Sequence, residues 1–178
     1  MVITEVNFIG ITPFDPKKDL LIKVKKFFEG SKKALIIRLN QSTYSESLIE
    51  EIENLSKRNQ SIIIFNSRNK MNNHSNIHLT SKDLMNSQKR FNGDFILGAS
   101  CHNREEIEKA NELQCDYVLI SPVQENKNKN KKIGWENFEK LAKDFNGKSF
   151  ALGGLRKEDL NKSLAHSGAG ISGIRCFF

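Results

Sequence analysis

Short apolar runs alternate with longer amphipathic segments along almost the whole chain. One such unit, residues 95–123, consists of an apolar run at 95–97, a Gly-Ala-Ser turn at 98–100, a helix at 103–113 and a second apolar run at 117–120. Asn103 can cap this helix with its side-chain oxygen, and the apolar residues of the helix fall at helical spacing on one face. Two apolar runs joined through a helix are expected to be parallel strands with a right-handed crossover.

The same alternation continues before and after this unit. Strands are expected at the apolar runs 7–12, 34–39, 61–65, 77–79, 95–97, 117–120, 149–152 and 170–174. Helices are expected at 16–29, 45–59, 103–113, 135–145 and 157–165, with a brief helix within 81–93. The first helix follows Asp15-Pro16, which supplies a cap and a proline at the first helical position. The strands lack polar alternation, which is typical of parallel strands covered by helices on both faces.

These elements predict an α/β protein, a compact TIM (β/α)8 barrel that forms a single domain over residues 1–178. The chain is shorter than the ~250 residues typical of this fold, so we expect stunted third and fourth helices and no full eighth helix. Phe177 and Phe178 must then cover the outside of the last strand, or a partner must. We therefore expect an exposed apolar patch beside the first and last strands, as a contact for a second copy of the chain or another protein.

Composition narrows the location and the ligand. The chain has no apolar run of membrane-spanning length and no signal-peptide pattern, so we expect a cytoplasmic protein that does not contact a membrane. Its three cysteines lack metal-binding spacing and are expected to be reduced. The net charge of +7 fits anionic ligands, but the lysines are scattered and aromatic residues for base stacking are few. Small phosphates are therefore favoured, and nucleic acid is not expected.

In a barrel of this type, ligands bind where the strands end, at their carboxyl ends. Two groups of residues at these positions suit phosphate. Gly153-Gly154 follows the seventh strand and Gly173 lies at the end of the eighth, where bare backbone N–H groups can approach an oxyanion. The glycine pair is also a common turn sequence, but its place after strand seven favours phosphate binding.

The chain contains a series of short motifs at and after the expected strands. The motifs are Ile37-Arg38, Asn66-Ser67-Arg68, Ile77-His78-Leu79, Gly98-Ala99-Ser100-Cys101-His102, Asp116-Tyr117-Val118, Ser121-Pro122-Val123, Leu152-Gly153-Gly154-Leu155 and Gly168-Ala169-Gly170-Ile171. Together they resemble the thiamine phosphate synthase/TenI family. Their order and spacing over nearly the whole chain carry the resemblance. It implies a transferase of thiamine biosynthesis that joins hydroxymethylpyrimidine diphosphate to thiazole phosphate and releases pyrophosphate, with magnesium as cofactor and phosphorylated thiamine precursors as ligands.

The resemblance also implies roles for individual residues. Arg38 would contact pyrophosphate, Asp83 would bind magnesium and Ser100 would bind near the pyrimidine or the pyrophosphate. Lys129 would take the place of a loop lysine of the family, although other lysines lie close to it in the sequence. The residues expected to bind substrate or phosphate are Asn66, His102, Gly153, Gly154, Gly173 and Arg175.

Four positions depart from the family pattern. Asn40 stands where the synthases carry lysine, Ser67 where they carry a second magnesium-binding aspartate, and Arg175 where they carry serine. Pro122 stands where TenI-type thiazole tautomerases carry histidine. Two alternatives therefore stay open beside the transferase.

The first alternative is a non-catalytic module that binds thiamine precursors. Such a module would resemble barrel domains fused to Nudix hydrolases and would act as companion to a hydrolase. The second is a TenI-like isomerase that uses His102 or His78. His78, on a strand, is more simply interpreted as a buried, hydrogen-bonded side chain.

Overall fold

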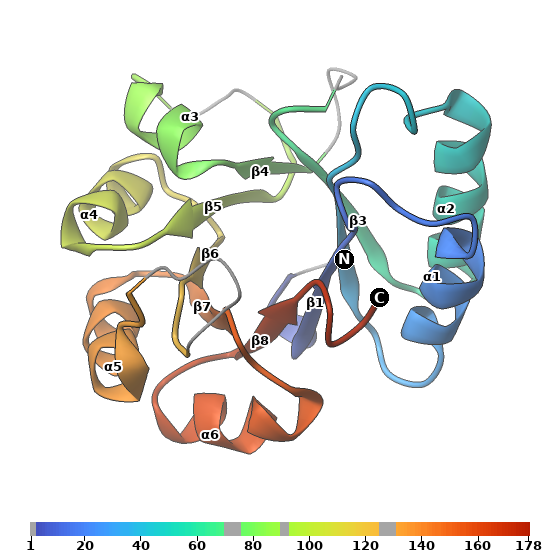
Figure 1. Cartoon of the computed structure of the whole chain (residues 1–178). Coiled ribbons are helices and arrows are strands. Elements are labelled where there is room, and N and C mark those ends of the chain that lie inside the picture. The colour runs from blue at the N-terminus through green and yellow to red at the C-terminus, as the bar shows by residue number, and fades with distance from the viewer. Residues whose placement is uncertain (1–2, 70–75, 90–92, 125–130) are drawn as a thin grey trace.

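The computed structural model describes residues 3–69, 76–89, 93–124 and 131–178, which form one closed barrel of parallel strands surrounded by helices (Figure 1). The strands are β1 (Phe8–Ile11), β2 (Ala34–Ile37), β3 (Ile62–Asn66), β4 (Ile77–Leu79), β5 (Leu97–Cys101), β6 (Tyr117–Ile120), β7 (Lys148–Leu152) and β8 (Gly170–Gly173). The α-helices are α1 (Leu20–Phe28), α2 (Glu46–Arg58), α3 (Ser81–Asn86), α4 (Arg104–Glu112), α5 (Gly134–Asp144) and α6 (Leu160–Ala165), and the 3-10 helices are η1 (Ile3–Glu5) and η2 (Lys157–Asp159). The predicted TIM barrel is confirmed.

Each strand pairs in parallel with the next one in the sequence, and β8 closes the ring on β1. The pairing of Gly10 with Gly173 places the last residue of β8 beside the third residue of β1. Because all strands run in the same direction, their carboxyl ends lie at one end of the barrel. Loops that are far apart in the sequence therefore meet there.

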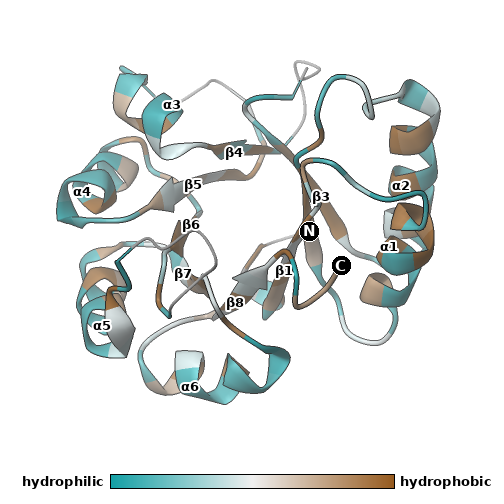
Figure 2. Ribbon diagram, viewed as in Figure 1, coloured by the Kyte–Doolittle hydropathy of each residue, from teal (hydrophilic) through white to brown (hydrophobic). Residues whose placement is uncertain are grey.

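Apolar side chains fill both sides of the barrel wall. The interior contains Ile9, Ile36, Ile64, Tyr117, Leu119 and Phe150, whereas the residues between them in the sequence face the helices. Both strand faces are thus buried, which explains the continuous apolar character of the strands. Figure 2 shows the same distribution, with hydrophobic strands inside a ring of helices that are hydrophilic outside.

The barrel is shortened where the sequence predicts it. Between β3 and β4, the described residues 67–69 and 76 are not helical, and α3 has six residues. The residues after β8, 174–178, form a turn. Phe177 and Phe178 fold back against Phe27, at ring-centroid distances of 4.9 and 5.5 Å, and are partly buried. They pack against Phe8 and Gly10 of β1 and so provide cover from within the chain, and the exposed apolar patch beside β8 and β1 stays a prediction.

Two local expectations are wrong. Residues 98–100 are part of β5 and do not form a turn, because Gly98 lies against the ring of Tyr117 and the strand continues to Cys101. The first helix begins at Leu20 and not at Pro16. Asp15 accepts a hydrogen bond from the side chain of Asn40 and is held in the loop that precedes α1.

Two further observations concern the cysteines and the helices. Cys101, Cys115 and Cys176 form no disulfide in the part of the chain that the structure describes. Within the described ranges, no helix has the length and apolar composition needed to span a bilayer.

Candidate active site

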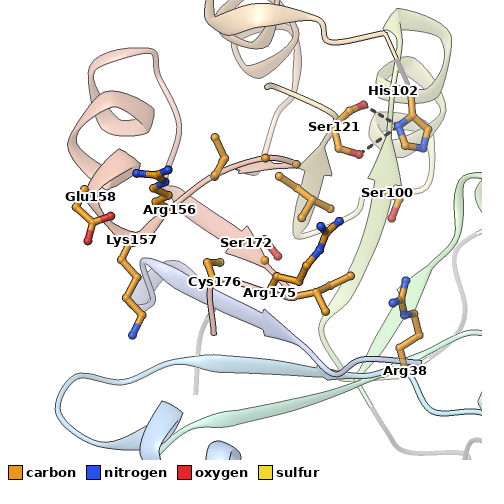
Figure 3. A pocket seen from close by; sticks show the side chains of 16 residues that line it. Arg38, Ser100, His102, Ser121, Arg156, Lys157, Glu158, Ser172, Arg175 and Cys176 are labelled. Carbon is orange, nitrogen blue, oxygen red and sulfur yellow. Dashed lines mark hydrogen bonds between the residues drawn. The ribbon is translucent and has the colours of Figure 1, made fainter. Parts of the chain in front are cut away.

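A cavity of about 800 Å³ opens at the carboxyl end of the barrel (Figure 3). Its floor consists of residues that follow the inward-facing residues of the strands. Arg38 follows Ala34 and Ile36 at the strand period of two, and Ser121 follows Tyr117 and Leu119 in the same way. The remaining lining residues are Ser100, His102, 152–158 and 172–176. Several residues that the sequence analysis names as candidates therefore line one cavity, among them Arg38, Ser100 and His102.

Arg38 brings a positive charge with an unused hydrogen-bond donor to this cavity. Its backbone N–H donates to Thr12 Oγ1 at 2.7 Å, which fixes the chain at the end of β2. Its side-chain Nε is buried and has no hydrogen-bond partner among the described residues. Burial, and after it the charge of Arg68, lower the pKa of Arg38. A partly buried guanidinium with an unpaired, buried N–H and a cationic neighbour is stabilised by an anionic ligand.

The opposite side of the cavity is formed by the ends of β7 and β8. Gly153 and Gly154 have φ values of +99° and +70°, and a Cβ on Gly153 would lie 2.8 Å from Pro122. The positive φ favours glycine at both positions, and the close approach to Pro122 also requires it at position 153. The last residue of β8, Gly173, also lines the cavity, followed by the exposed Arg175.

The charged residues that line the cavity are mainly cationic. Figure 3 shows Arg38 and Arg175 in the same cavity as Ser100 and Ser172. The charged lining residues are Arg38, Arg156, Lys157, Arg175 and one acid, Glu158. This balance suits a phosphorylated ligand.

Ser100 and His102 are both held by hydrogen bonds. Ser100 Oγ lies 2.9 Å from Nε2 of the buried His78, and His78 Nδ1 lies 2.9 Å from the Tyr117 hydroxyl. His78 is therefore the buried, hydrogen-bonded histidine that the sequence predicts. His102 Nδ1 lies 2.7 Å from the carbonyl oxygen of Ser121, which can only accept, so Nδ1 carries a hydrogen.

Asp83, the predicted magnesium ligand, lies in the first turn of α3 and does not line the cavity described here. Its Oδ2 accepts hydrogen bonds from Ser67 Oγ at 2.5 Å and Thr80 Oγ1 at 2.7 Å. These bonds, first the one from Ser67, lower the pKa of Asp83, so the carboxylate is ionised at neutral pH.

The donor set limits how a magnesium ion could be held. Among the described residues there is no group of three or more His, Cys, Asp or Glu side chains that could hold a metal ion. Asp83 is the carboxylate predicted for magnesium, and a single carboxylate suits this ion when ligand phosphates supply further oxygen ligands.

Asn66, like Asp83, is a predicted site residue that lies outside the cavity lining, and Lys129 cannot be placed. Asn66 is buried, and its Oδ1 accepts from the backbone N–H of Arg68. Asn40, at a position of departure, accepts from the backbone N–H and hydroxyl of Thr43 and stabilises the turn after β2. Lys129 falls outside the described residues, so its role stays a prediction.

Three contributors to the site were missed in the sequence. Arg156 and Lys157 line the cavity, and their position directly after the predicted glycine pair was a usable signal. Tyr117 reaches the site through His78. No sequence signal paired these two residues, which are 39 positions apart.

Comparison with known proteins assigns the chain to a family. The sequence profile described as thiamine monophosphate synthase matches residues 8–177. A thiamine-phosphate synthase of Prochlorococcus marinus strain AS9601 is 35% identical over 83% of this chain and 44% of its own length. A second, from P. marinus subsp. pastoris, is 30% identical over 97% of this chain and 50% of its own length. The chain thus spans about half the length of these relatives.

Solved structures agree on the fold. A thiamine phosphate pyrophosphorylase from Pyrococcus furiosus superposes with a TM-score of 0.72 over 96% of this chain and 86% of that one, at 17% identity. The order of motifs, the closed barrel and a profile match over nearly the whole chain lead to one conclusion: this chain belongs to the thiamine monophosphate synthase family.

Proposed function

We propose that this chain is a transferase of the thiamine phosphate synthase type, which joins hydroxymethylpyrimidine diphosphate to thiazole phosphate. The observation that carries the proposal is the unpartnered, buried Nε of Arg38 in a cationic cavity at the carboxyl end of the barrel. A pocket of this kind has the charge needed for a diphosphate on one substrate and a phosphate on the other. Family membership supports the choice of these two substrates.

In this reaction the bond between the pyrimidine methylene carbon and the diphosphate oxygen breaks, and negative charge develops on the departing pyrophosphate. Arg38 and Ser100 would stabilise that charge by donating hydrogen bonds in a partly buried site. A magnesium ion held by Asp83 and the diphosphate would add Lewis-acid stabilisation of the same charge. Lys129 is proposed as a further cation for this group.

The acceptor phosphate is assigned to the β7–β8 side of the cavity. Gly153, Gly154 and Gly173 would bring backbone N–H groups close to its oxygens, and Arg175 would add a charge. His102 and Asn66 remain proposed substrate-binding residues. His102 lines the cavity, whereas Asn66 lies outside the lining and accepts a hydrogen bond from the backbone N–H of Arg68.

The test uses this chain alone, because it spans about half the length of its relatives. Purified protein is incubated with both substrates and magnesium, and thiamine phosphate and pyrophosphate are measured. We expect both products in equal amounts, and at least tenfold less with Arg38→Ala, given the ~1.5 to 3 kcal/mol of a hydrogen bond to a charged group. No product from folded protein would refute the proposal.

The departures from the family pattern define a second candidate to test, a module that binds thiamine precursors without turnover. Asn40 and Ser67, two positions of departure, are engaged in hydrogen bonds within the protein. Calorimetry with thiamine phosphate, pyrophosphate and thiazole phosphate separates the candidates. Phosphate-dependent binding without product would favour the module, and a Nudix hydrolase would then be the partner to test.

A further inference from the structure

The contact between His78 and Tyr117 depends on a glycine between them. His78 pairs with Gly98 across β4 and β5, and Gly98 pairs with Tyr117 across β5 and β6, so the three residues lie at one level of the barrel. A Cβ on Gly98 would lie 2.0 Å from the Tyr117 ring. The two rings therefore meet in front of the glycine, with centroids 5.6 Å apart and an interplanar angle of 24°.

Ser100 lies two residues after Gly98 on the same face of β5, closer to the mouth of the barrel. This position lets His78 contact Tyr117 with one ring nitrogen and Ser100 with the other. Tyr117 is fully buried and His78 is 2% exposed, whereas Ser100 lines the cavity. A hydrogen-bonded chain thus runs from the dry interior to the ligand side.

The direction of these hydrogen bonds follows from counting donors and acceptors. Burial lowers the pKa of His78 to about 3, so its ring is neutral, with one nitrogen as donor and the other as acceptor. If Nδ1 carried the hydrogen, the Tyr117 hydroxyl would accept it. The hydroxyl's own hydrogen would then be buried without an acceptor among the described residues, which is unfavourable.

The other tautomer satisfies every group. Tyr117 donates to Nδ1, and the N–H at Nε2 donates to Ser100 Oγ. The hydrogen of the Ser100 hydroxyl is then not used by His78 and is left for a ligand in the cavity.

We propose that Tyr117 and His78 are positioning residues that fix Ser100 as a hydrogen-bond donor toward the cavity. Ser100 then selects ligand atoms that accept hydrogen bonds and carry negative charge, such as diphosphate oxygens. The identity of this anion rests on the proposed function, whereas the orientation of the chain of hydrogen bonds does not.

The first experiment determines the tautomer of His78 by NMR of protein with 15N-labelled histidine. Wild-type protein is expected to show an unprotonated Nδ1 and a protonated Nε2. Tyr117→Phe removes the donor to Nδ1 but keeps the ring, so the Nδ1 resonance should shift toward that of an unprotonated nitrogen without a hydrogen bond. A hydrogen on Nδ1 in wild-type protein, or an Nδ1 resonance that does not change in Tyr117→Phe, would overturn the inference.

The second experiment measures binding of inorganic pyrophosphate by calorimetry. Ser100→Ala should weaken binding about tenfold or more, as expected for a lost hydrogen bond to a charged group. Tyr117→Phe should weaken it a few-fold, and should have no further effect in the Ser100→Ala background, because the two residues act through one group. The control is Tyr44→Phe, which removes the other tyrosine hydroxyl, outside the cavity lining, and should leave binding unchanged.

The possible results separate this inference from the proposed function. An equal effect of Tyr117→Phe with and without Ser100 would indicate general damage to the barrel and overturn the inference, as would the absence of pyrophosphate binding to wild-type protein. Absence of turnover, with the expected tautomer and the expected non-additivity, would refute the transferase alone.

Discussion

Gly98→Ala is expected to destabilise the barrel strongly, although it adds a single methyl group. The new Cβ would lie 2.0 and 2.1 Å from two ring atoms of Tyr117, which is fully buried. The ring must move, and overpacking of this kind costs about 1 to 3 kcal/mol. Movement of the ring also separates its hydroxyl from His78 and leaves buried polar groups unsatisfied, for about 1 to 3 kcal/mol more. We therefore expect a loss of roughly 2 to 6 kcal/mol in the free energy of unfolding.

Urea unfolding, followed by the fluorescence of the single tryptophan and by circular dichroism, measures this loss. The matched control is Gly30→Ala, because Gly30 has φ +89° but no atom within 4 Å of an added Cβ. That control should cost about 1 to 2 kcal/mol, from backbone conformation alone.

A compensating variant tests whether the contact is the cause. Tyr117→Leu removes the ring atoms that the new Cβ meets, so Gly98→Ala should cost less than ~1 kcal/mol in this background. The reasoning is refuted if Gly98→Ala costs no more than Gly30→Ala, or if its cost is the same with tyrosine and with leucine at position 117.

Three further predictions concern the residues proposed to bind anions and magnesium. Arg38→Ala should weaken pyrophosphate binding, measured by calorimetry, about tenfold or more. The control Arg58→Ala, at the exposed far end of α2, should leave binding unchanged. Equal losses in the two variants would contradict the assignment of Arg38 to the anion site. Arg175→Ser should weaken inorganic phosphate binding a few-fold at low salt and less at high salt, since the exposed charge is screened; tighter binding would show that Arg175 blocks the cavity. Ser67→Asp replaces a hydroxyl that donates to Asp83 with a second carboxylate and should raise magnesium affinity about tenfold in the absence of phosphates, measured by calorimetry. Equal affinity in wild-type and variant protein would contradict that prediction.

The sequence by itself determined the order and type of the elements, because these depend on local interactions. Asn103 caps α4 with its side-chain oxygen, as predicted, and Ser45 caps α2 in the same way; both helices begin at the next residue. The apolar run 117–120 coincides with β6. Capping and hydrophobic periodicity act within a few residues, so they can be read from one segment at a time.

The sequence also predicted that the candidate site residues lie together at one end of the barrel. In a closed parallel barrel every strand ends at the same side. Once eight strands were recognised, Arg38, Ser100 and the glycines after β7 were therefore expected close together, and they line one cavity. The resemblance to the family added the expected chemistry. The sequence shows that Asn40 and Ser67 stand where the family carries lysine and aspartate, but it does not show which groups these two residues contact.

Only the tertiary structure decided what those residues contact. Gly98, in β5, leaves room for the ring of Tyr117, which is 19 positions later in the sequence. Asp15 accepts a hydrogen bond from Asn40, which holds it in a loop. Ser67 became a hydrogen-bond donor to Asp83, 16 positions away. Each of these partners belongs to a different βα unit and is brought close by closure of the barrel. Local composition therefore carries no information about the pairings, and they appear only when the strands are set in register.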